Sequence, residues 1–188
     1  DDVESRGLGD VYKRQEQIYL GSVFPSENLA WRNDFRYKGI NLGLLFTGRI
    51  GGICYSATQA NMDLYGVSEV SAAARDAGGV LINGREMVDA QKWYQAIGSQ
   101  SGLPQYYTYS ATNVRLQEAS IGYTIPRKKL GDVCDITLSI VGRNLWMLYN
   151  KAPFDPEAVA TTSNYYQGID YFMMPSLRSI GFNVRVKF

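Results

Sequence analysis

Asp155 and Glu157 are the first residues to consider for catalysis, because they place two carboxylates on either side of Pro156. Glycoside hydrolases use a pair of carboxylates, one on each side of the bond that they cleave. The spacing by itself says little, since surface loops often carry acidic pairs. A catalytic pair and a solvated loop are therefore both open at this point.

The sequence contains no histidine. This removes the commonest general base and the commonest metal ligand. A Ser-His-Asp triad therefore cannot be assembled. We expect no catalytic residue, no metal site and no cofactor.

Six aromatic residues fall in two segments that we expect to be loops. Aromatic side chains stack on sugars and are enriched in protein interfaces. For any single one of them, packing within the loop or anchoring at a membrane interface is the simpler interpretation. As a group they are our candidates for contact with a substrate or a partner protein: Trp93, Tyr94, Tyr106, Tyr107, Tyr165 and Tyr166.

The charge balance does not point to nucleic acid as a partner. The chain has 19 basic and 18 acidic residues, without the concentrated basic patch that binds phosphates. No run approaches the roughly 18 apolar residues of a membrane-spanning helix, which leaves membrane strands open. Asp1–Gln15 have no helix or strand period and are interpreted as a sequencing scar, so we treat residues 16–188 as the structural part.

The end of the chain alternates strictly between apolar and polar residues. Ile180, Phe182 and Val184 share one parity, and Asn183 falls on the other. This period of two predicts a strand with one apolar and one polar face. In an earlier stretch the parity changes, which a bulge near residues 118–120 would explain. The predicted strands are residues 17–24, 37–49, 114–125, 135–146 and 178–188.

The connections between these strands alternate in length, with short links at 25–32 and 126–132 and long ones at 51–110 and 147–177. This rhythm is typical of outer-membrane barrels, whose periplasmic turns are short and whose extracellular loops are long. Five strands cannot close a transmembrane barrel. The sequence therefore predicts an all-β fold that supplies the C-terminal antiparallel strands of a larger barrel, or that pairs with another chain.

Aromatic residues at the strand ends would form girdles at the two membrane interfaces. We place Trp31, Tyr37 and Tyr123 at the rim with the short turns. We place Trp146 and Tyr149 at the opposite rim.

The long segment after the second strand carries signals of local structure. Asn83-Gly84 between two apolar stretches is typical of a type I′ hairpin. Asp89 and Ser68 can each cap a short helix that a glycine ends. Cys54 and Cys134 fall near opposite ends of the sheet, roughly 20 Å or more apart. A disulfide needs Cα atoms within about 7 Å, so we expect none.

Nine short stretches occur in the order and spacing of a known transporter family. They are Tyr37-Lys38-Gly39, Gly51-Gly52 with Tyr55, Val114-Arg115-Leu116, Ile121-Gly122-Tyr123-Thr124-Ile125-Pro126, Gly142-Arg143-Asn144-Leu145, Phe154-Asp155-Pro156-Glu157, Gln167-Gly168-Ile169-Asp170, Pro175-Ser176-Leu177-Arg178-Ser179 and Phe188. Each is weak alone. Together, over roughly residues 19–188, the chain resembles the SusC/RagA-type TonB-dependent outer-membrane transporters.

The resemblance implies a 22-stranded barrel in the outer membrane of a Gram-negative bacterium. Such a barrel imports oligosaccharides or peptides with energy from the TonB complex, through an N-terminal part that this sequence lacks. It also implies a SusD-like surface lipoprotein, for which the loop aromatics are candidate contacts. Phe188 is similar to the signal that the barrel-assembly machinery reads, and the stretch around Pro156 becomes a loop-shaping motif.

Two other functions stay open. One is a secreted or surface-exposed soluble β-rich binding module, which would need its apolar faces turned inward. The other is a hydrolase on a β scaffold, which the missing histidine disfavours.

Overall fold

The computed structural model describes residues 18–160 and 166–188. Asp1–Gln15, interpreted above as a scar, and Tyr165 lie outside the described residues. The described chain forms two compact units. We call them the sheet unit (residues 23–53, 110–159 and 173–188) and the loop unit (residues 18–22, 54–109, 160 and 166–172).

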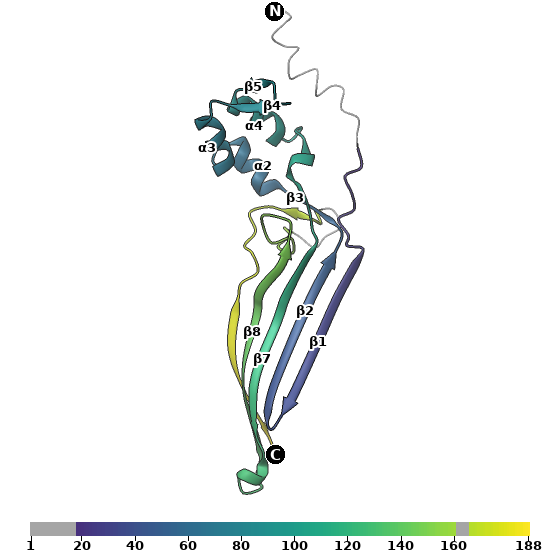
Figure 1. The fold of residues 1–188 in the computed structure, drawn as a ribbon, viewed down its shortest axis with the longest axis vertical. Helices are drawn as coiled ribbons and strands as arrows, with labels where there is room; N and C mark the ends of the chain where they lie inside the picture. Colours follow the sequence, from purple (N-terminus) through teal and green to yellow (C-terminus); the bar gives the residue numbers. More distant parts are fainter. Residues whose placement is uncertain (1–17, 161–165) are drawn as a thin grey trace, which may run out of the picture. The chain divides into compact units, whose positions relative to one another are not determined.

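The sheet unit is a five-stranded sheet with the strand order β1-β2-β7-β8-β10 (Figure 1). All four neighbouring pairs are antiparallel. The predicted all-β fold of antiparallel strands is therefore confirmed. The strands are β1 (Glu27–Tyr37), β2 (Ile40–Ile50), β7 (Asn113–Ile125), β8 (Asp135–Asn150) and β10 (Ser179–Lys187).

The first predicted strand and the link after it are wrong. Residues 18–24 form no strand, and β1 begins within the predicted link at 25–32. A two-residue turn, Lys38-Gly39, joins β1 to β2 with φ angles of 47° and 91°. A type I′ hairpin turn needs positive φ at both of these positions. Gly39 is the residue in the local sequence that indicates a turn at this position.

The predicted bulge is present one residue earlier than expected. Leu45 pairs with Glu118, whereas its neighbour Phe46 pairs with Leu116, so Gln117 is the extra residue of β7. The Gln117 amide donates a hydrogen bond of 2.9 Å to Asn144 Oδ1 on β8. This side-chain bond bridges the two strands where the register changes.

The two short turns are offset along the strands. Ile40, the first paired residue of β2, lies level with Tyr123 and hence with Leu138 of β8. In the pairing of β8 with β7, the first residue of β8 after its own turn is Ile136, two positions earlier. The turns are thus offset by two residues along the strands, about 6.6 Å, over two strand spacings across the sheet, about 9.6 Å. The ratio of these two lengths gives a strand tilt of about 35°. That is the tilt at which a sheet closes into a barrel with its turns on one rim.

The loop unit holds three short helices, a hairpin and a small sheet. The hairpin and two of the helices, α3 and α4, are where the sequence predicts them. Their order in the chain is β3 (Ile53–Ser56), α2 (Ala57–Leu64), α3 (Glu69–Asp76), β4 (Val80–Ile82), β5 (Glu86–Val88), α4 (Ala90–Gly98), η1 (Pro104–Tyr107), β6 (Thr108–Ser110) and β9 (Ile169–Asp170). The core consists of Ala60, Ala90, Tyr94, Ile97 and Tyr107.

Capping side chains begin each helix as the local sequence dictates. Ser68 accepts a hydrogen bond from the backbone N–H of Ser71 at 3.0 Å, and Asp89 accepts one from Lys92 at 3.0 Å. Ser56 caps α2, the helix that the sequence analysis missed. None of the helices in residues 18–160 and 166–188 is long and apolar enough to cross a membrane.

Candidate functional site

The five-stranded sheet has one apolar face, and that face is exposed. Its side chains come from alternate positions on all five strands, as the predicted period of two requires. Trp31 stacks on Phe46 of the next strand with 5.7 Å between ring centroids. The exposed apolar residues of this face include Leu29, Trp31, Phe35, Tyr37, Ile40, Leu42, Ile121, Tyr123, Leu138, Ile140, Trp146, Ile180, Phe182, Val184 and Val186.

The opposite face is polar and carries an open groove of about 550 Å³. Hydrogen bonds cross it from strand to strand, from Asn41 to Thr124 at 2.8 Å and between Thr124 and Thr137 at 3.0 Å. Outward-facing apolar and inward-facing polar side chains are the pattern of a transmembrane barrel wall. The groove is lined mainly by polar residues, including Asp34, Arg36, Asn41, Ser120, Thr124, Asp135, Thr137, Ser139, Arg185 and Lys187.

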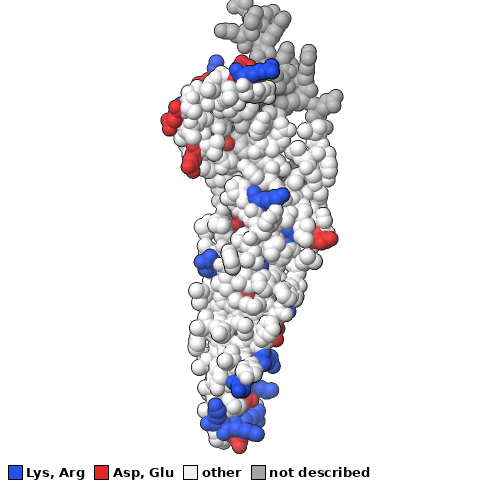
Figure 2. All heavy atoms as spheres, in the orientation of Figure 1, with Lys and Arg blue, Asp and Glu red and all other residues white. Residues whose placement is uncertain are grey.

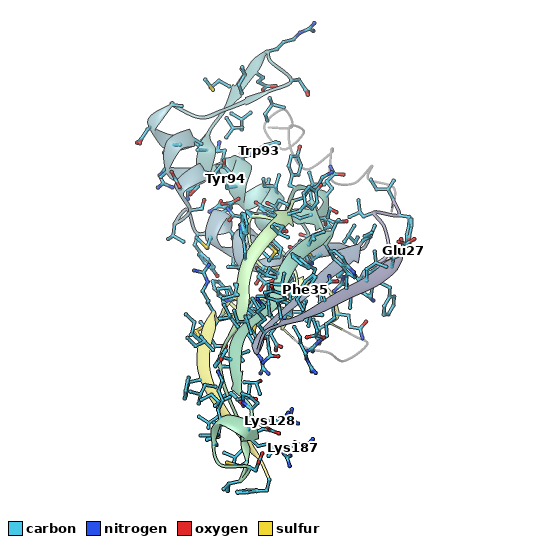
Figure 3. The ribbon with its side chains drawn as sticks, turned by 60° about the horizontal axis from the view of Figure 1, so that its bottom comes forward. Glu27, Phe35, Trp93, Tyr94, Lys128 and Lys187 are labelled. Atoms are coloured by element: carbon cyan, nitrogen blue, oxygen red, sulfur yellow. The ribbon has the colours of Figure 1, made fainter. Side chains whose placement is uncertain are left out.

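Charge is uneven over the sheet unit. In the view of Figure 2, charged side chains are sparse along the middle of the sheet and gather at the end that holds η2 (Arg127–Lys129). Lys128 and Lys187 both lie at this end (Figure 3). Arg127 is paired with Asp135 at 3.4 Å, and its backbone N–H donates to the same carboxylate at 2.7 Å.

The strand register corrects the predicted position of one girdle residue. Tyr37 lies level with Ile40 and Tyr123, as predicted for one rim. Trp31 does not join them. It pairs with Phe46, which lies level with Leu116, and Leu116 pairs with Trp146. Trp31 therefore belongs to the Trp146 row, about 20 Å along the strand from Tyr37.

A buried ion pair holds the segment after β8. Arg115 Nη2 lies 2.9 Å from Asp155 Oδ1, and the two side chains are only 4% and 8% exposed. Glu157 lies 3.5 Å from the same nitrogen but is 40% exposed. The Asp155 carboxylate also accepts backbone N–H groups of Glu157 at 3.1 Å and Ser176 at 3.2 Å.

Asp155 is thus fully engaged in structural contacts. Burial by itself would raise its pKa, but hydrogen bonds from Arg115, Ser176 and Glu157, with the charge of Arg115, hold the pKa below its ordinary value. Pro156, between the two acids, is fully buried. A carboxylate paired in this way is not available as a general acid, which supports the loop-shaping interpretation of this stretch.

The loop aromatics divide into core and surface residues. Tyr94 and Tyr107 are 8% and 2% exposed and belong to the loop-unit core, so they do not present their rings to a ligand. Trp93 packs edge-to-face on Tyr106, with centroids 5.8 Å apart. Tyr106 and Tyr166 are about half exposed. Contact with a substrate or lipoprotein stays a prediction for Trp93, Tyr106 and Tyr166.

The helices of the loop unit surround a cavity of about 480 Å³. Trp93 and Tyr94 both project from α4 (Figure 3), and Tyr94 lines the cavity. Asp63, in the last turn of α2, is 4% exposed and lines the cavity. Sequence reasoning missed Asp63, and it named Arg115 only within the stretch Val114-Arg115-Leu116, without predicting its burial or its ion pair. The further lining residues are Leu64, Tyr65, Gly66, Ser71, Arg75, Ala90, Gln91 and Gln95.

Cys54 and Cys134, both in the described part of the chain, are not joined in a disulfide. The Cys54 thiol is buried and donates to the Tyr109 carbonyl at 3.7 Å. No group of three or more His, Cys, Asp or Glu side chains in residues 18–160 and 166–188 could hold a metal ion.

Similarity to solved structures defines the class of fold. The chain superposes on the RagAB peptide importer in its open-open state with a TM-score of 0.63 and 15% identity, covering 89% of this chain and 18% of that one. For the closed-closed state the TM-score is 0.61 with 17% identity, covering 90% and 18%. The fold is therefore that of strands from the wall of such a barrel.

A curated relative gives the same result from sequence. The chain is 24% identical over 190 residues to TonB-dependent receptor P3 of Formosa agariphila, covering 97% of this chain and 18% of the receptor. No family model matches the sequence. The resemblance to SusC/RagA-type TonB-dependent transporters, predicted from the sequence, is confirmed. The chain spans about a fifth of the length of the proteins that it matches.

Proposed function

We propose that this chain forms part of the wall and outer loops of a TonB-dependent importer in the outer membrane of a Gram-negative bacterium. The observation that carries the proposal is the sheet with two unlike faces. One face exposes Ile, Leu, Phe and Val side chains on all five strands, and the other is polar. Such a large exposed apolar surface marks a contact with lipid or protein.

In this proposal the apolar face contacts lipid and the polar face lines the lumen. Tyr37 and Tyr123 sit at the periplasmic interface, and Trp146 and Tyr149 sit at the extracellular one, as aromatic girdles. Trp31 lies between the two interfaces. Because the soluble binding module would need this face turned inward, its exposure disfavours that alternative.

The partners follow from the same proposal. A SusD-like lipoprotein would cover the extracellular mouth and contact exposed loop aromatics such as Tyr106 and Tyr166. TonB would act through an N-terminal plug region, and the barrel-assembly machinery would recognise Phe188, which is 85% exposed. The cargo class is oligosaccharides or peptides; similarity to a peptide importer supports the second.

Cysteine labelling of two adjacent residues tests the orientation of the sheet. In a background with Cys54→Ala and Cys134→Ser, Ser139→Cys on the polar face should react with a water-soluble maleimide in outer membranes. Ile140→Cys on the apolar face should react only after detergent is added. Equal labelling of the two positions in intact membranes would contradict the proposal.

A further inference from the structure

Basic side chains gather at the end of the sheet unit that holds η2 (Figure 2). They come from three separate segments of the chain, which is why the sequence showed no basic patch. The strand register brings together the turn after β1, the turn after β7 and the last residues of β10. We call the basic residues of these segments the basic rim: Arg36, Lys38, Arg127, Lys128, Lys129, Arg185 and Lys187.

The excess of positive charge is confined to this end of the sheet. Residues 36–38, 127–135 and 185–187 contain seven basic residues and two acidic ones, Asp132 and Asp135, which gives a net charge of +5. The whole chain has 19 basic and 18 acidic residues, a net charge of only +1. The Asp135 carboxylate is already bound to Arg127. Positive charge gathered in this way attracts an anionic partner.

Three lysines in the two turns are placed to contact such a partner. Lys38, Lys128 and Lys129 have exposed side chains. None of the ion pairs within residues 18–160 and 166–188 involves these three lysines. Other members of the basic rim line the polar groove and add to the positive field from there: Arg36, Arg185 and Lys187.

The basic rim directly borders the exposed apolar face of the sheet. Lys38 Nζ lies 5.2 Å from the ring centroid of Tyr37, which belongs to that face and is 69% exposed. Val133, 65% exposed, adds an apolar side chain to the turn that carries Lys128 and Lys129. Cations at the aromatic edge of an apolar band lie at the depth of lipid headgroups. An anionic lipid accounts for the charge and for the apolar side chains, whereas an acidic protein accounts for the charge alone.

We propose that the basic rim binds anionic phospholipid, with the ammonium groups of Lys38, Lys128 and Lys129 on the lipid phosphates. This inference rests on the proposed contact of the apolar face with lipid. The two turns are two strand spacings apart across the sheet, about 10 Å, so their lysines act on neighbouring headgroups. Headgroups with a net negative charge, such as phosphatidylglycerol, are therefore enriched here over zwitterionic phosphatidylcholine.

Cys134 provides a local reporter, because it follows Lys128 and Lys129 in the same turn. A bimane fluorophore is attached to it in the complete protein, with Cys54→Ala and any other cysteine replaced, in bilayers of phosphatidylcholine. A small fraction of nitroxide-labelled phosphatidylglycerol or nitroxide-labelled phosphatidylcholine is the quencher. At low salt, phosphatidylglycerol should quench about threefold or more efficiently than phosphatidylcholine. The ratio should fall toward one in about 1 M NaCl, where the Debye length is about 3 Å.

Two triple variants with the same loss of charge assign the preference to the turn lysines. The first removes the proposed phosphate contacts and should bring the quenching ratio close to one: Lys38→Gln, Lys128→Gln and Lys129→Gln. The second removes three exposed cations outside the basic rim and should keep the wild-type ratio: Arg85→Gln, Lys92→Gln and Lys151→Gln. Quenching by phosphatidylcholine should be the same in both variants, which shows that they are inserted equally. A preference that survives the first variant, or that falls equally in both, would overturn the proposal.

The two lipids also separate failure of this inference from failure of the proposed function. Equal quenching of the wild type by both lipids would overturn the inference and leave the membrane placement intact. Absence of quenching by either lipid would contradict both. Equal lipid quenching, together with retention on immobilised polyglutamate that the first triple variant loses, would assign the basic rim to an acidic protein and overturn the lipid proposal.

Discussion

Arg115 Nη2 and Asp155 Oδ1 are 2.9 Å apart, although 40 residues separate them in the sequence. Arg115 belongs to β7, and Asp155 lies in the segment that follows β8. Asp155 in turn receives the backbone N–H of Ser176, shortly before β10. The pair therefore fixes both ends of the connection between the last two strands to the sheet.

Removing one partner of this pair should destabilise the sheet unit strongly. Asp155→Asn leaves the buried Arg115 guanidinium with only the half-exposed Glu157 carboxylate, at 3.5 Å, as counter-ion. We therefore expect a loss of about 3 kcal/mol, the lower end of the range for broken buried pairs. Unfolding in urea, followed by tryptophan fluorescence, measures the change. Glu157→Gln is the matched control, since Glu157 is 40% exposed and should change the free energy of unfolding by less than about 1 kcal/mol. Similar losses for both variants would contradict the role assigned to Asp155.

The same pair predicts a pH dependence. The folded-state pKa of Asp155 is lowered from its ordinary 3.8. Its contribution to stability is therefore complete above pH 3.8 and is lost as the pH falls below that value through the folded-state pKa. Urea unfolding at several acidic pH values should show the gap between wild type and Asp155→Asn narrowing below pH 3.8. A gap that stays constant down to pH 2 would refute this prediction.

Local sequence rules predicted the parts of the fold that depend on neighbouring residues. The caps Ser68 and Asp89 and the Asn83-Gly84 turn were found because each acts within four residues. Asn83 and Gly84 have φ angles of 52° and 68°, as the predicted hairpin requires. Strands with a clear period of two were found for the same reason.

Such local rules cannot predict strand register or the burial of individual charged residues, because both depend on residues that are far apart in the sequence. The row that joins Trp31 to Trp146 depends on the register of four strands and on the bulge at Gln117. An error in the first strand therefore placed Trp31 level with Tyr37, although six positions of β1 separate the two residues. The burial of Arg115 and Asp63 follows from packing, which the sequence around these residues does not reveal.

Gly39 should be more sensitive to substitution than another turn glycine. A Cβ at Gly39 would lie 3.0 Å from the Thr124 carbonyl oxygen and 3.0 Å from the Tyr123 ring, at a φ of 91°. Gly131 also has a positive φ, 69°, but a Cβ there meets nothing within 4 Å. Backbone strain should lower the free energy of unfolding of both alanine variants by roughly 1 kcal/mol. The close contacts should lower that of Gly39→Ala further. Urea unfolding of the two variants should rank them in this order, and the reverse ranking would contradict it.

The two rows of aromatics predict the depth of individual tryptophans in a bilayer. Trp31 and Trp146 share one row, whereas Trp93 belongs to the loop unit. Three strand spacings separate Trp31 from Trp146 along this row, and with a tilt of about 35° the row rises by roughly 8 Å toward the outer rim over that distance. Single-tryptophan variants in bilayers of lipids brominated at defined depths should therefore show Trp31 quenched most by a lipid brominated deeper in the bilayer than the lipid that quenches Trp146 most. Trp93 should be quenched by none of them. Maximal quenching of Trp146 by a lipid brominated deeper than the one that quenches Trp31 most would contradict the register and the tilt.

Substitution by arginine should have different effects on the two faces of β7. Ile121 lies on the apolar face opposite Leu42 and Ile140, and its neighbour Ser120 lines the polar groove. If the apolar face contacts lipid, Ile121→Arg should destabilise the folded membrane protein by about 1–3 kcal/mol, because Ile121 lies between the interface, where arginine on the lipid face costs about 0–1 kcal/mol, and the midplane, where it costs about 2–4 kcal/mol. Ser120→Arg should destabilise the folded protein much less, because the groove is polar and open to water. Equilibrium unfolding in bilayers measures both variants, together with the amount of protein found in the outer membrane. A larger loss for Ser120→Arg than for Ile121→Arg would mean that the polar face contacts lipid, and the proposed orientation of the sheet would be wrong.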